Sequence, residues 1–371
     1  MRDALLDIPS SDIDISMVNA DHDFPRILAK ELNGEIISMS QFGTAKLLIK
    51  NNVVDLATAR NEKYERPGAL PTVCSGTILE DMARRDFTVN SIAVSLSLDS
   101  WGNVFDPFEG IRDLQDKNIR TLHAKSFIDD PTRIFRTIRY SERLLFKVEH
   151  KTMSELKNNV GYLNCVKGDR IRREMEKIFQ EYRAIPMLAK AQELRVLSTV
   201  YPSLMLKESL LKKLSQTTIG DARKRSLIFL SLLTHESPPS HRCGIMKRLN
   251  LDTKTKKLVK DTGLVHEFLS NLKSQDTKYS QFHKVLAPLD SLAIEACLLA
   301  TDDDLIKLKL KTYLTYKRHA TSILQGDDLV KLGIPEGPQI GQILEKLLLA
   351  KMDEQITTRK EEEEFTRDQM E

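Results

Sequence analysis

Two aspartates separated by one residue, Asp12 and Asp14, lie near the beginning of the chain. Ile13 and Ile15 alternate with them, and this alternation predicts a β-strand. Side chains at positions i and i+2 of a strand point to the same face, so both carboxylates are expected to project together. Two neighbouring negative charges favour a divalent cation with oxygen ligands, above all Mg²⁺, which also binds substrate phosphates. The pair therefore predicts metal-assisted phosphoryl transfer, although the same tripeptide also occurs at solvated strand ends.

A third carboxylate, Asp55, lies in a predicted β-hairpin. The runs 45–49 and 53–57 are short and apolar, and the pair Asn51-Asn52 between them is a hairpin signal. Asp55 lies on the second strand of this hairpin, where it could join the face of the first two acids. The sequence does not fix the register that would decide this.

A cluster of arginines follows further along the chain. Asp130 and Pro131 predict a helix start, with aspartate at the N-cap and proline in the first position. Guanidinium groups bind phosphate and the edges of bases. Asp130 and Arg133, one turn apart, offer an acceptor and donors together, as reading the Watson–Crick edge of a nucleobase requires. A solvated basic helix face is the alternative for the same pattern, whose four arginines on one side are Arg133, Arg136, Arg139 and Arg143.

Another arginine pair, Arg84 and Arg85, precedes Asp86 and an apolar stretch over 92–98. One interpretation is surface charge with Asp86 as an ion-pair partner, which adds little to stability. The other is that one arginine binds a triphosphate, while Asp86 and Asn90 fix the geometry of the loop.

The elements that must position these residues divide the chain into a mixed part and a helical part. Strand-like and helix-like stretches alternate over residues 1–120, with a helix predicted around 24–32 and a loop at 65–71. From about 121 onward apolar residues recur at three- and four-residue spacing, and no strong strand pattern follows Leu98. The acidic end, 361–371, is expected to be frayed.

Composition excludes several classes of protein. The 371 residues are 41% hydrophobic and 29% charged, and the net charge of +3 allows a nucleic-acid partner only through local clustering. The four cysteines form no C-x-x-C pair, which argues against a zinc site or a disulfide framework and predicts a cytoplasmic location. No apolar run is long enough to span a membrane, and the N-terminus lacks the apolar region of a signal peptide.

These segments together resemble the class II tRNA nucleotidyltransferases, the CCA-adding enzymes, and the related bacterial poly(A) polymerases. The matches follow the family's order over residues 1 to about 180, and those at 84–90 and 129–133 are specific. Residues 332–341 also look like the family's tail domain. The matching motifs are Arg2-Asp3 with Asp12-x-Asp14, Asp55-x-Ala57-Thr58-x-Arg60, Arg84–Asn90, Asp106-x-x-x-Gly110, Asp129–Arg133 and Arg170-Ile171-x-x-Glu174.

The resemblance implies a role for each matching acid. Asp12 and Asp14 would hold Mg²⁺. Asp55 stands where the family has its third carboxylate, usually Glu, which helps to deprotonate the primer hydroxyl. The loop from Asn61 to Pro71 matches the family's flexible loop, which is tied to the switch from C to A addition.

The resemblance also implies how the nucleotide is bound. Arg2 and Arg85 would bind its triphosphate. Asp130 and Arg133 would form the amino-acid template that pairs with incoming ATP or CTP. Further nucleotide contacts would come from two more arginines of the same helix, Arg136 and Arg139.

The implied fold class is α+β: a small nucleotidyltransferase palm, made of a mixed β-sheet with helices, followed by an all-α neck, body and tail. The expected domains are a head at 1–120, a nucleotide-selecting neck at 121–180, a body at 181–265 and a tRNA-binding tail at 266–371. The implied function is template-independent addition of CMP and/or AMP to the tRNA 3′ end, with release of pyrophosphate. Whether CCA, CC or A is added, and the oligomeric state, stay open.

Two positions depart from the family's pattern. The Gly-Gly before Arg2 is absent, and Met1 stands where relatives carry Val. A start assigned at a GTG codon that encodes an internal valine would explain this, and an in-frame stop codon upstream would exclude it. If the truncation is real, glycine amides that cradle phosphate are missing. Asp129 replaces the usual Glu just outside the proposed template. The alternatives are therefore a poly(A) polymerase and a truncated, non-catalytic RNA-binding remnant.

Overall fold

The computed structural model describes residues 1–9, 12–19, 21, 23–40, 43–215, 217, 219–272 and 277–369, and of Asp12 only the backbone. Two compact units make up the chain, Met1–Val200 and Tyr201–Glu371. The predicted α+β class is confirmed, because the mixed sheet lies in the first unit and many helices follow. The four-part division stays a prediction; helix α14, Thr253–Ser270, runs continuously through its expected boundary at 265.

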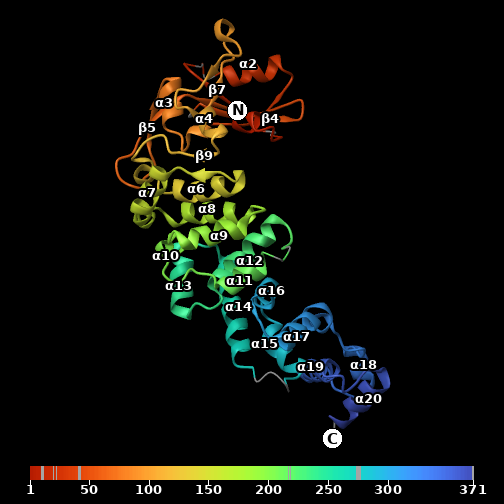
Figure 1. Ribbon diagram of the computed structural model, residues 1–371. Helices are drawn as coiled ribbons and strands as arrows, with labels where there is room; N and C mark the ends of the chain where they lie inside the picture. Colours follow the sequence, from red (N-terminus) through yellow and green to blue (C-terminus); the bar gives the residue numbers. More distant parts are fainter. Residues whose placement is uncertain are drawn as a thin grey trace. The chain divides into compact units, whose positions relative to one another are not determined.

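The first unit begins with a part in which strands alternate with short helices (red to yellow in Figure 1). Its elements up to residue 119 are α1 Arg2–Leu5, β1 Asp12–Met17, α2 Phe24–Glu31, β2 Glu35–Met39, β3 Thr44–Ile49, β4 Asn52–Thr58, β5 Arg60–Lys63, β6 Thr72–Ser75, α3 Ile78–Ala83, η1 Thr88–Asn90, β7 Ala93–Val94, η2 Leu98–Ser100, β8 Val104–Phe105, α4 Gly110–Gln115 and β9 Asn118–Ile119. The remaining elements of the unit are α5 Ser126–Asp129, α6 Arg133–Leu144, β10 Lys147–Val148, α7 His150–Asn159, η3 Val160–Cys165, α8 Gly168–Gln180, α9 Ala184–Glu193 and α10 Val196–Val200.

The main sheet of the described residues has four strands in the order β1-β4-β3-β2. β1 and β4 are parallel, and the other neighbours are antiparallel. Lys50 and Asn51 join β3 to β4 with φ values of 45° and 68°. A two-residue type I′ hairpin turn requires positive φ at both of its central residues. The predicted hairpin is therefore confirmed, with its turn one residue earlier than the Asn-Asn pair.

The two faces of this sheet differ in polarity because polar and apolar residues alternate along its central strands. One face packs against α2 and forms a core of Met17, Ala29, Ala45, Leu47, Val54 and Leu56. The register pairs Asp14 with Asp55, and Asp55 with Lys46. Residues paired in this way share one face of a sheet, so these three lie on the face opposite the core.

The structure corrects three local expectations. Helix α6 begins at Arg133 with Thr132 as its N-cap, so the prediction that Asp130 is the N-cap is wrong. Asp130 is extended (φ −130°, ψ 91°), as the residue before a proline usually is, and its Oδ1 accepts from the Thr132 N–H. Pro131 and Thr132 lie between it and the first residue of the regular helix, Arg133. The stretch 92–98 forms only the two-residue strand β7. One further strand, β10, lies beyond residue 121 and pairs with β9.

The second unit is helical throughout its described residues. Its elements are α11 Glu208–Leu214, α12 Ala222–Thr234, α13 Pro239–Arg248, α14 Thr253–Ser270, α15 Tyr279–Leu286, α16 Ser291–Ala300, α17 Asp304–Thr315, η4 Lys317–His319, α18 Gly326–Lys331, α19 Pro338–Met352 and α20 Arg359–Asp368. Separate apolar clusters form around Phe282 and Tyr313 and around Leu329 and Leu347. None of the described helices combines the length and apolar character that crossing a bilayer requires.

Helix α20 contains residues 361–368 of the acidic end, so the expectation that this segment frays is wrong there; residues 370 and 371 lie outside the described residues. Thr358 and Glu361 form a capping box at its start. Glu362 is completely buried, and its carboxylate accepts hydrogen bonds from the backbone N–H groups of Ile323 and Leu324 at 2.8–2.9 Å. A buried carboxylate that satisfies two backbone donors ties this helix to the loop before α18.

We expect Glu362→Ala to lower the free energy of unfolding by about 2–3 kcal/mol, because it removes the acceptor of two backbone donors. Urea unfolding followed by circular dichroism measures the effect. Glu364→Ala is the matched control, since Glu364 lies on the exposed side of the same helix and its loss should stay within about 0.5 kcal/mol. Equal stability of the two variants would show that the buried carboxylate does not anchor the helix.

Candidate active site

The acidic face of the sheet contains a carboxylate pair. Asp14 and Asp55 are register partners on adjacent parallel strands, which lie about 4.8 Å apart. The Lys46 ammonium lies 3.3 Å from Asp55 Oδ2, and both side chains are about two-fifths exposed. The backbone of Asp12 pairs with Val53, but its side chain lies outside the described residues. The structure thus brings two of the three predicted acids together and does not test the third.

The residues of this face suit a divalent cation. Asp14 and Asp55 offer carboxylate oxygens, which are the ligands that Mg²⁺ and Ca²⁺ prefer. Lys46 already compensates the charge of Asp55, which shows that the face favours a positive partner. The described part of the chain contains no group of three or more His, Cys, Asp or Glu residues that could hold a metal ion. The described acids would therefore complete their coordination with water, substrate oxygens or Asp12.

Two of the predicted triphosphate ligands converge on Asn90. Arg85 Nη1 donates to the Asn90 carbonyl oxygen at 3.0 Å, and Arg2 Nη1 donates to Asn90 Oδ1 at 2.6 Å. Asn90 Nδ2 in turn donates to Asp86 Oδ1 at 2.9 Å. Arg136 Nε donates to the other oxygen of Asp86 at 2.6 Å. Asp86 and Asn90 thus hold three arginines in one cluster, and the hydrogen bond between the two residues spans the loop whose geometry they were expected to fix.

The arginine cluster surrounds an aromatic ring that the sequence analysis did not single out. The guanidinium carbons of Arg2, Arg136, Arg139 and Arg143 lie 5.0–5.5 Å from the ring centroid of Tyr140. Cation–π attraction at this distance offsets part of the repulsion between like charges. The only sequence signal was the position of the tyrosine inside R-x-x-R-Y-x-x-R.

Carboxylates keep these arginines charged despite their burial. Burial alone would lower the pKa of Arg136, but the neighbouring Asp86 carboxylate outweighs it and raises this pKa. Burial also lowers the pKa of Arg143, but its ion pair with Glu181 outweighs burial and raises this pKa. Arg139 Nη1 donates to Glu174 at 3.2 Å. The cluster is therefore electrostatically balanced before any substrate arrives.

The two predicted template residues have different partners. Asp130 Oδ1 accepts hydrogen bonds from the Thr132 backbone and hydroxyl and from Arg170 Nη2 at 2.7 Å. Arg133 is buried, and it donates to Ser126 Oγ at 2.6 Å and to the Arg84 carbonyl at 2.5 Å. The Arg133 backbone N–H donates to the Asp130 carbonyl oxygen at 3.0 Å, but no hydrogen bond or ion pair is described between their two side chains. Sequence reasoning gave Arg170 no role, although it lies in the quoted motif Arg170-Ile171-x-x-Glu174.

Helix α6 has no single solvated basic face. Arg133 and Arg139 are only 5% and 4% exposed, whereas Arg136 keeps 30% of its side chain exposed. Arg2 and Arg85 keep 15% and 34%. Among the arginines predicted to bind the nucleotide, Arg2, Arg85 and Arg136 thus keep part of their side chains accessible although protein groups also bind them, whereas Arg133 and Arg139 are almost fully buried.

The predicted flexible loop begins and ends as a small hairpin. β5 pairs with β6 on either side of residues 64–71. Gly68 has a φ of +70°, and its carbonyl accepts a hydrogen bond from Arg170 Nη1 at 2.9 Å. Arg170 thus contacts both this loop and Asp130. The role of the loop in nucleotide selection stays a prediction.

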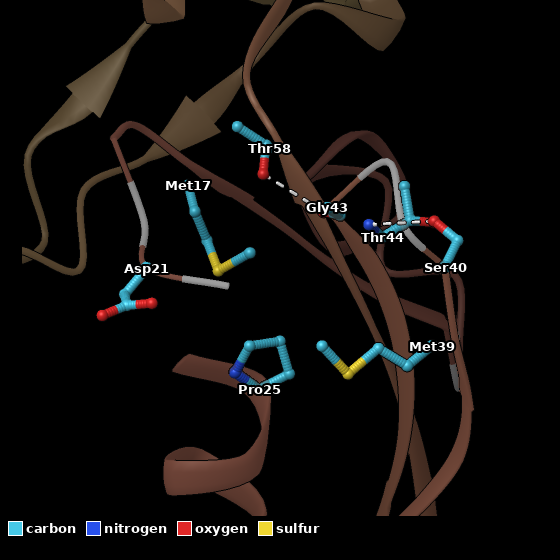
Figure 2. Close-up of a pocket in the computed structure, with 8 residues that line it drawn as sticks. All are labelled: Met17, Asp21, Pro25, Met39, Ser40, Gly43, Thr44 and Thr58. Carbon is cyan, nitrogen blue, oxygen red and sulfur yellow. Dashed lines mark hydrogen bonds between the residues drawn. The ribbon is translucent and has the colours of Figure 1, made fainter. Parts of the chain in front are cut away.

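Figure 2 shows a pocket at the C-terminal ends of β1 and β4. Its volume is about 120 Å³. It is lined by Met17, Asp21, Pro25, Met39, Ser40, Gly43, Thr44 and Thr58. None of the acids or arginines described above lines it. Its volume is well below the roughly 300–1,000 Å³ of typical ligand pockets, so it is no nucleotide site.

Two family models match separate segments of the chain. Residues 1–120 match the poly A polymerase head domain. Residues 145–207 match a model described as the probable RNA and SrmB-binding site of polymerase A. The matched segments contain the acidic face, Arg2, Arg85 and the helix that carries Arg170.

Curated relatives match nearly the whole chain. The A-adding tRNA nucleotidyltransferase of Geobacter sulfurreducens is 31% identical over 98% of this chain and 43% of its own length. That of Aquifex aeolicus is 31% identical over 94% and 43%. The chain thus spans less than half the length of these two relatives. The A-adding enzyme of Halalkalibacterium halodurans is 28% identical over 93% of this chain and 81% of its own length.

Solved structures agree over the same range. A CCA-adding enzyme in an apo form has a TM-score of 0.84 at 28% identity and covers 99% of this chain and 89% of its own. The Thermotoga maritima CCA-adding enzyme in complex with tRNA has a TM-score of 0.77 at 27% identity, covering 100% and 89%. Motif order, family models and similarity over nearly all of this chain therefore agree. The chain belongs to the family of class II tRNA nucleotidyltransferases and bacterial poly(A) polymerases.

Proposed function

We propose that this chain adds CMP and/or AMP to the 3′ end of tRNA without a nucleic-acid template and releases pyrophosphate. The observation that carries the proposal is the arrangement within the first unit. The Asp14–Asp55 pair lies on an open sheet face, and Arg2 and Arg85 converge on Asn90 nearby in the same unit. Such an arrangement provides carboxylates for a cation and guanidinium groups for a triphosphate. Relatives solved with tRNA, with CTP and with ATP support the choice of substrates.

The family uses divalent metal ions, and we propose Mg²⁺ held by Asp12 and Asp14. When bound, such an ion stabilises the charge that develops on the transferring phosphate and on the leaving oxygen. Arg2 and Arg85 bind and orient the triphosphate, and Asp55 stands ready to accept the proton of the primer hydroxyl. Lys46 limits the repulsion between the acids until substrate arrives.

Nucleotide selection falls to the segment around Asp130. Its carboxylate accepts hydrogen bonds, and Arg170 and Thr132 fix its orientation. Arg133 would join it as the donor of the amino-acid template, with Arg136 and Arg139 behind it. Because Arg133 is buried against Arg84, we infer that it must leave this partner to pair with a base.

We propose a cytoplasmic location on chemical grounds. The four cysteines are free, and three of them are exposed. Exposed free thiols persist in compartments that are kept reducing.

A poly(A) polymerase is the second candidate, because the head domain matches that family model.

Incorporation of labelled CTP and ATP distinguishes the candidates when three RNAs are offered: tRNA that lacks CCA, tRNA that ends in CC, and an unrelated RNA. Addition of AMP to tRNA ending in CC, with no CTP incorporation into the shorter tRNA and no ATP incorporation into the unrelated RNA, identifies an A-adding activity, which the three A-adding relatives favour. CTP incorporation into the shorter tRNA identifies CC or CCA addition. ATP incorporation into every RNA identifies a poly(A) polymerase, and RNA binding without addition to any of them overturns the proposal.

We expect Asp14→Asn to reduce kcat for nucleotide addition at least a hundredfold, because a carboxylate that stabilises the transition state is lost. Binding of tRNA, measured by filter retention, should stay within a factor of two. Asp23→Asn serves as the control, since Asp23 is an exposed acid at the start of α2 outside the proposed site. Retention of more than a tenth of the activity by Asp14→Asn would remove this residue from the mechanism.

We expect Asp130→Ala to lower discrimination between correct and incorrect nucleotides, because a base edge loses its acceptor. The ratio of kcat/KM for the preferred nucleotide to that for UTP should fall by about tenfold or more, as the loss of one charged hydrogen bond predicts. Single-nucleotide addition to tRNA measures both values. Asp116→Ala is the control, because Asp116 is an exposed acid at the end of α4. An unchanged ratio would exclude Asp130 from the template.

A further inference from the structure

Asp81 of helix α3 is a buried carboxylate with partners from four parts of the first unit. Only 1% of its side chain is exposed. Its Oδ1 accepts from Arg84 Nε at 3.0 Å, from Arg84 Nη2 at 2.7 Å and from the Arg60 backbone N–H at 3.3 Å. Its Oδ2 accepts from Ser16 Oγ at 3.3 Å and from Arg85 Nη2 at 3.5 Å. A carboxylate that is buried to this degree is stable only if it is paired and hydrogen-bonded.

Asp81 remains charged in this surrounding. Burial raises the pKa of a carboxyl group, but Arg84 and Arg85 outweigh burial and hold the pKa of Asp81 below its ordinary value. Both arginines are therefore oriented by a fixed negative charge. The two guanidinium groups differ in their freedom. Arg84 is held by Asp81 and by Glu62 at 3.1 Å, whereas the described partners of the Arg85 guanidinium are Asp81 at 3.5 Å and the Asn90 carbonyl.

The partners of Asp81 lie next to the residues that the proposed chemistry uses. Ser16 follows Asp14 by two positions on β1 and therefore lies on the same face of the sheet. Arg85 is one of the two arginines expected on the triphosphate. One side chain thus connects the strand of the metal-binding acids to an arginine of the triphosphate site.

Relative position matters here because one substrate must contact both groups. The cation is held at the acidic strand, and the phosphates that it contacts are also held by Arg85. A misplacement of about 1 Å between reacting groups costs up to about a hundredfold in rate. The hydrogen bonds of Asp81 and its partners suit the task of keeping this distance fixed.

We propose that Asp81 is a positioning residue that keeps the triphosphate-binding Arg85 in register with the acidic strand β1. The proposal rests on the proposed function, because it assigns Arg85 to the triphosphate. Asp81 itself touches no substrate. Its hydrogen bond with Ser16 fixes the position of strand β1, and its charge orients the guanidinium group of Arg85.

The two contacts can be tested separately. Asp81→Asn keeps the size of the side chain, but removes the charge that orients Arg85. Its amide oxygen can still accept from the Arg60 backbone N–H, and its amide NH2 can donate to Ser16 Oγ, so the connection to the strand can persist. We expect KM for ATP to rise at least fivefold and kcat/KM to fall about 30- to 100-fold. Ser16→Ala leaves the charge and the arginines in place and loosens only the strand. We expect kcat to fall about three- to tenfold with KM for ATP unchanged.

Asp261→Asn is the matched control for stability. Asp261 is also a buried aspartate on a helix, where it pairs with Lys257 and accepts from the Asp290 backbone N–H at 2.9 Å. It lies in the second unit, outside the proposed nucleotide site. Its loss should lower the melting temperature without changing KM for ATP. A merely structural role of Asp81 would give the same result.

Calorimetric binding of ATP to the tRNA-free protein gives a readout that does not depend on turnover. We expect Kd for ATP to rise at least fivefold in Asp81→Asn and to stay unchanged in Ser16→Ala and Asp261→Asn. Unchanged Kd and KM in a folded Asp81→Asn overturn the positioning role alone. If Asp81→Asn does not fold, wild-type kcat in Ser16→Ala overturns it. A wild-type chain that neither binds ATP nor adds a nucleotide overturns the proposed function, and this assignment with it.

Discussion

Arginines can be held close together only where carboxylates and aromatic faces offset their mutual repulsion, and this constraint shapes the first unit. Four guanidinium groups lie around the ring of Tyr140. Asp86, Glu174 and Glu181 each neutralise one of the arginines on α6. These protein carboxylates thus stabilise the clustered arginines, and the cluster exists before a triphosphate binds. Preorganisation of this kind avoids reorganisation at the moment of reaction.

Register imposes a second constraint, on the acids. β1 and β4 are parallel neighbours although 34 residues separate the end of β1 from the start of β4. A shift of one residue would move Asp14 to the apolar face and Ile13 or Ile15 to the solvent. The apolar face against α2 therefore fixes the acids indirectly, because the core of Leu47, Val54 and Leu56 tolerates one register only. The chemistry of one face depends on the packing of the other.

The sequence was informative where the signal is local. Alternation of Ile and Asp predicted β1, and the pair of short apolar runs predicted the β3–β4 hairpin. Partners distant in sequence could not be predicted. Arg133 is buried because the Arg84 carbonyl, 49 residues away, accepts from it, and Arg139 because Glu174 is 35 residues away. No helical periodicity contains that information.

The same limit explains the residues that were missed. The hydrogen bond from Arg170, 40 residues away, to the Asp130 carboxylate could not be predicted from the local pattern around Asp130. Tyr140 and Asp81 are unremarkable in sequence, since a tyrosine in a helix and an aspartate one turn before an arginine both have routine explanations. Only the convergence of several arginines on each of them distinguishes these residues, and convergence is a property of the tertiary structure.

Two neighbouring arginines show how burial decides function within one motif. Arg84 lies between the carboxylates of Asp81 and Glu62, and all of its charge is directed into the protein. Arg85 has one carboxylate partner at 3.5 Å and remains a third exposed. A phosphate can compete more readily for the second guanidinium than for the first, because it would have to separate the first from two buried acids. Identical residue types one position apart are thereby separated into an anchor and a ligand, and the acids around them, rather than the arginines, make the difference.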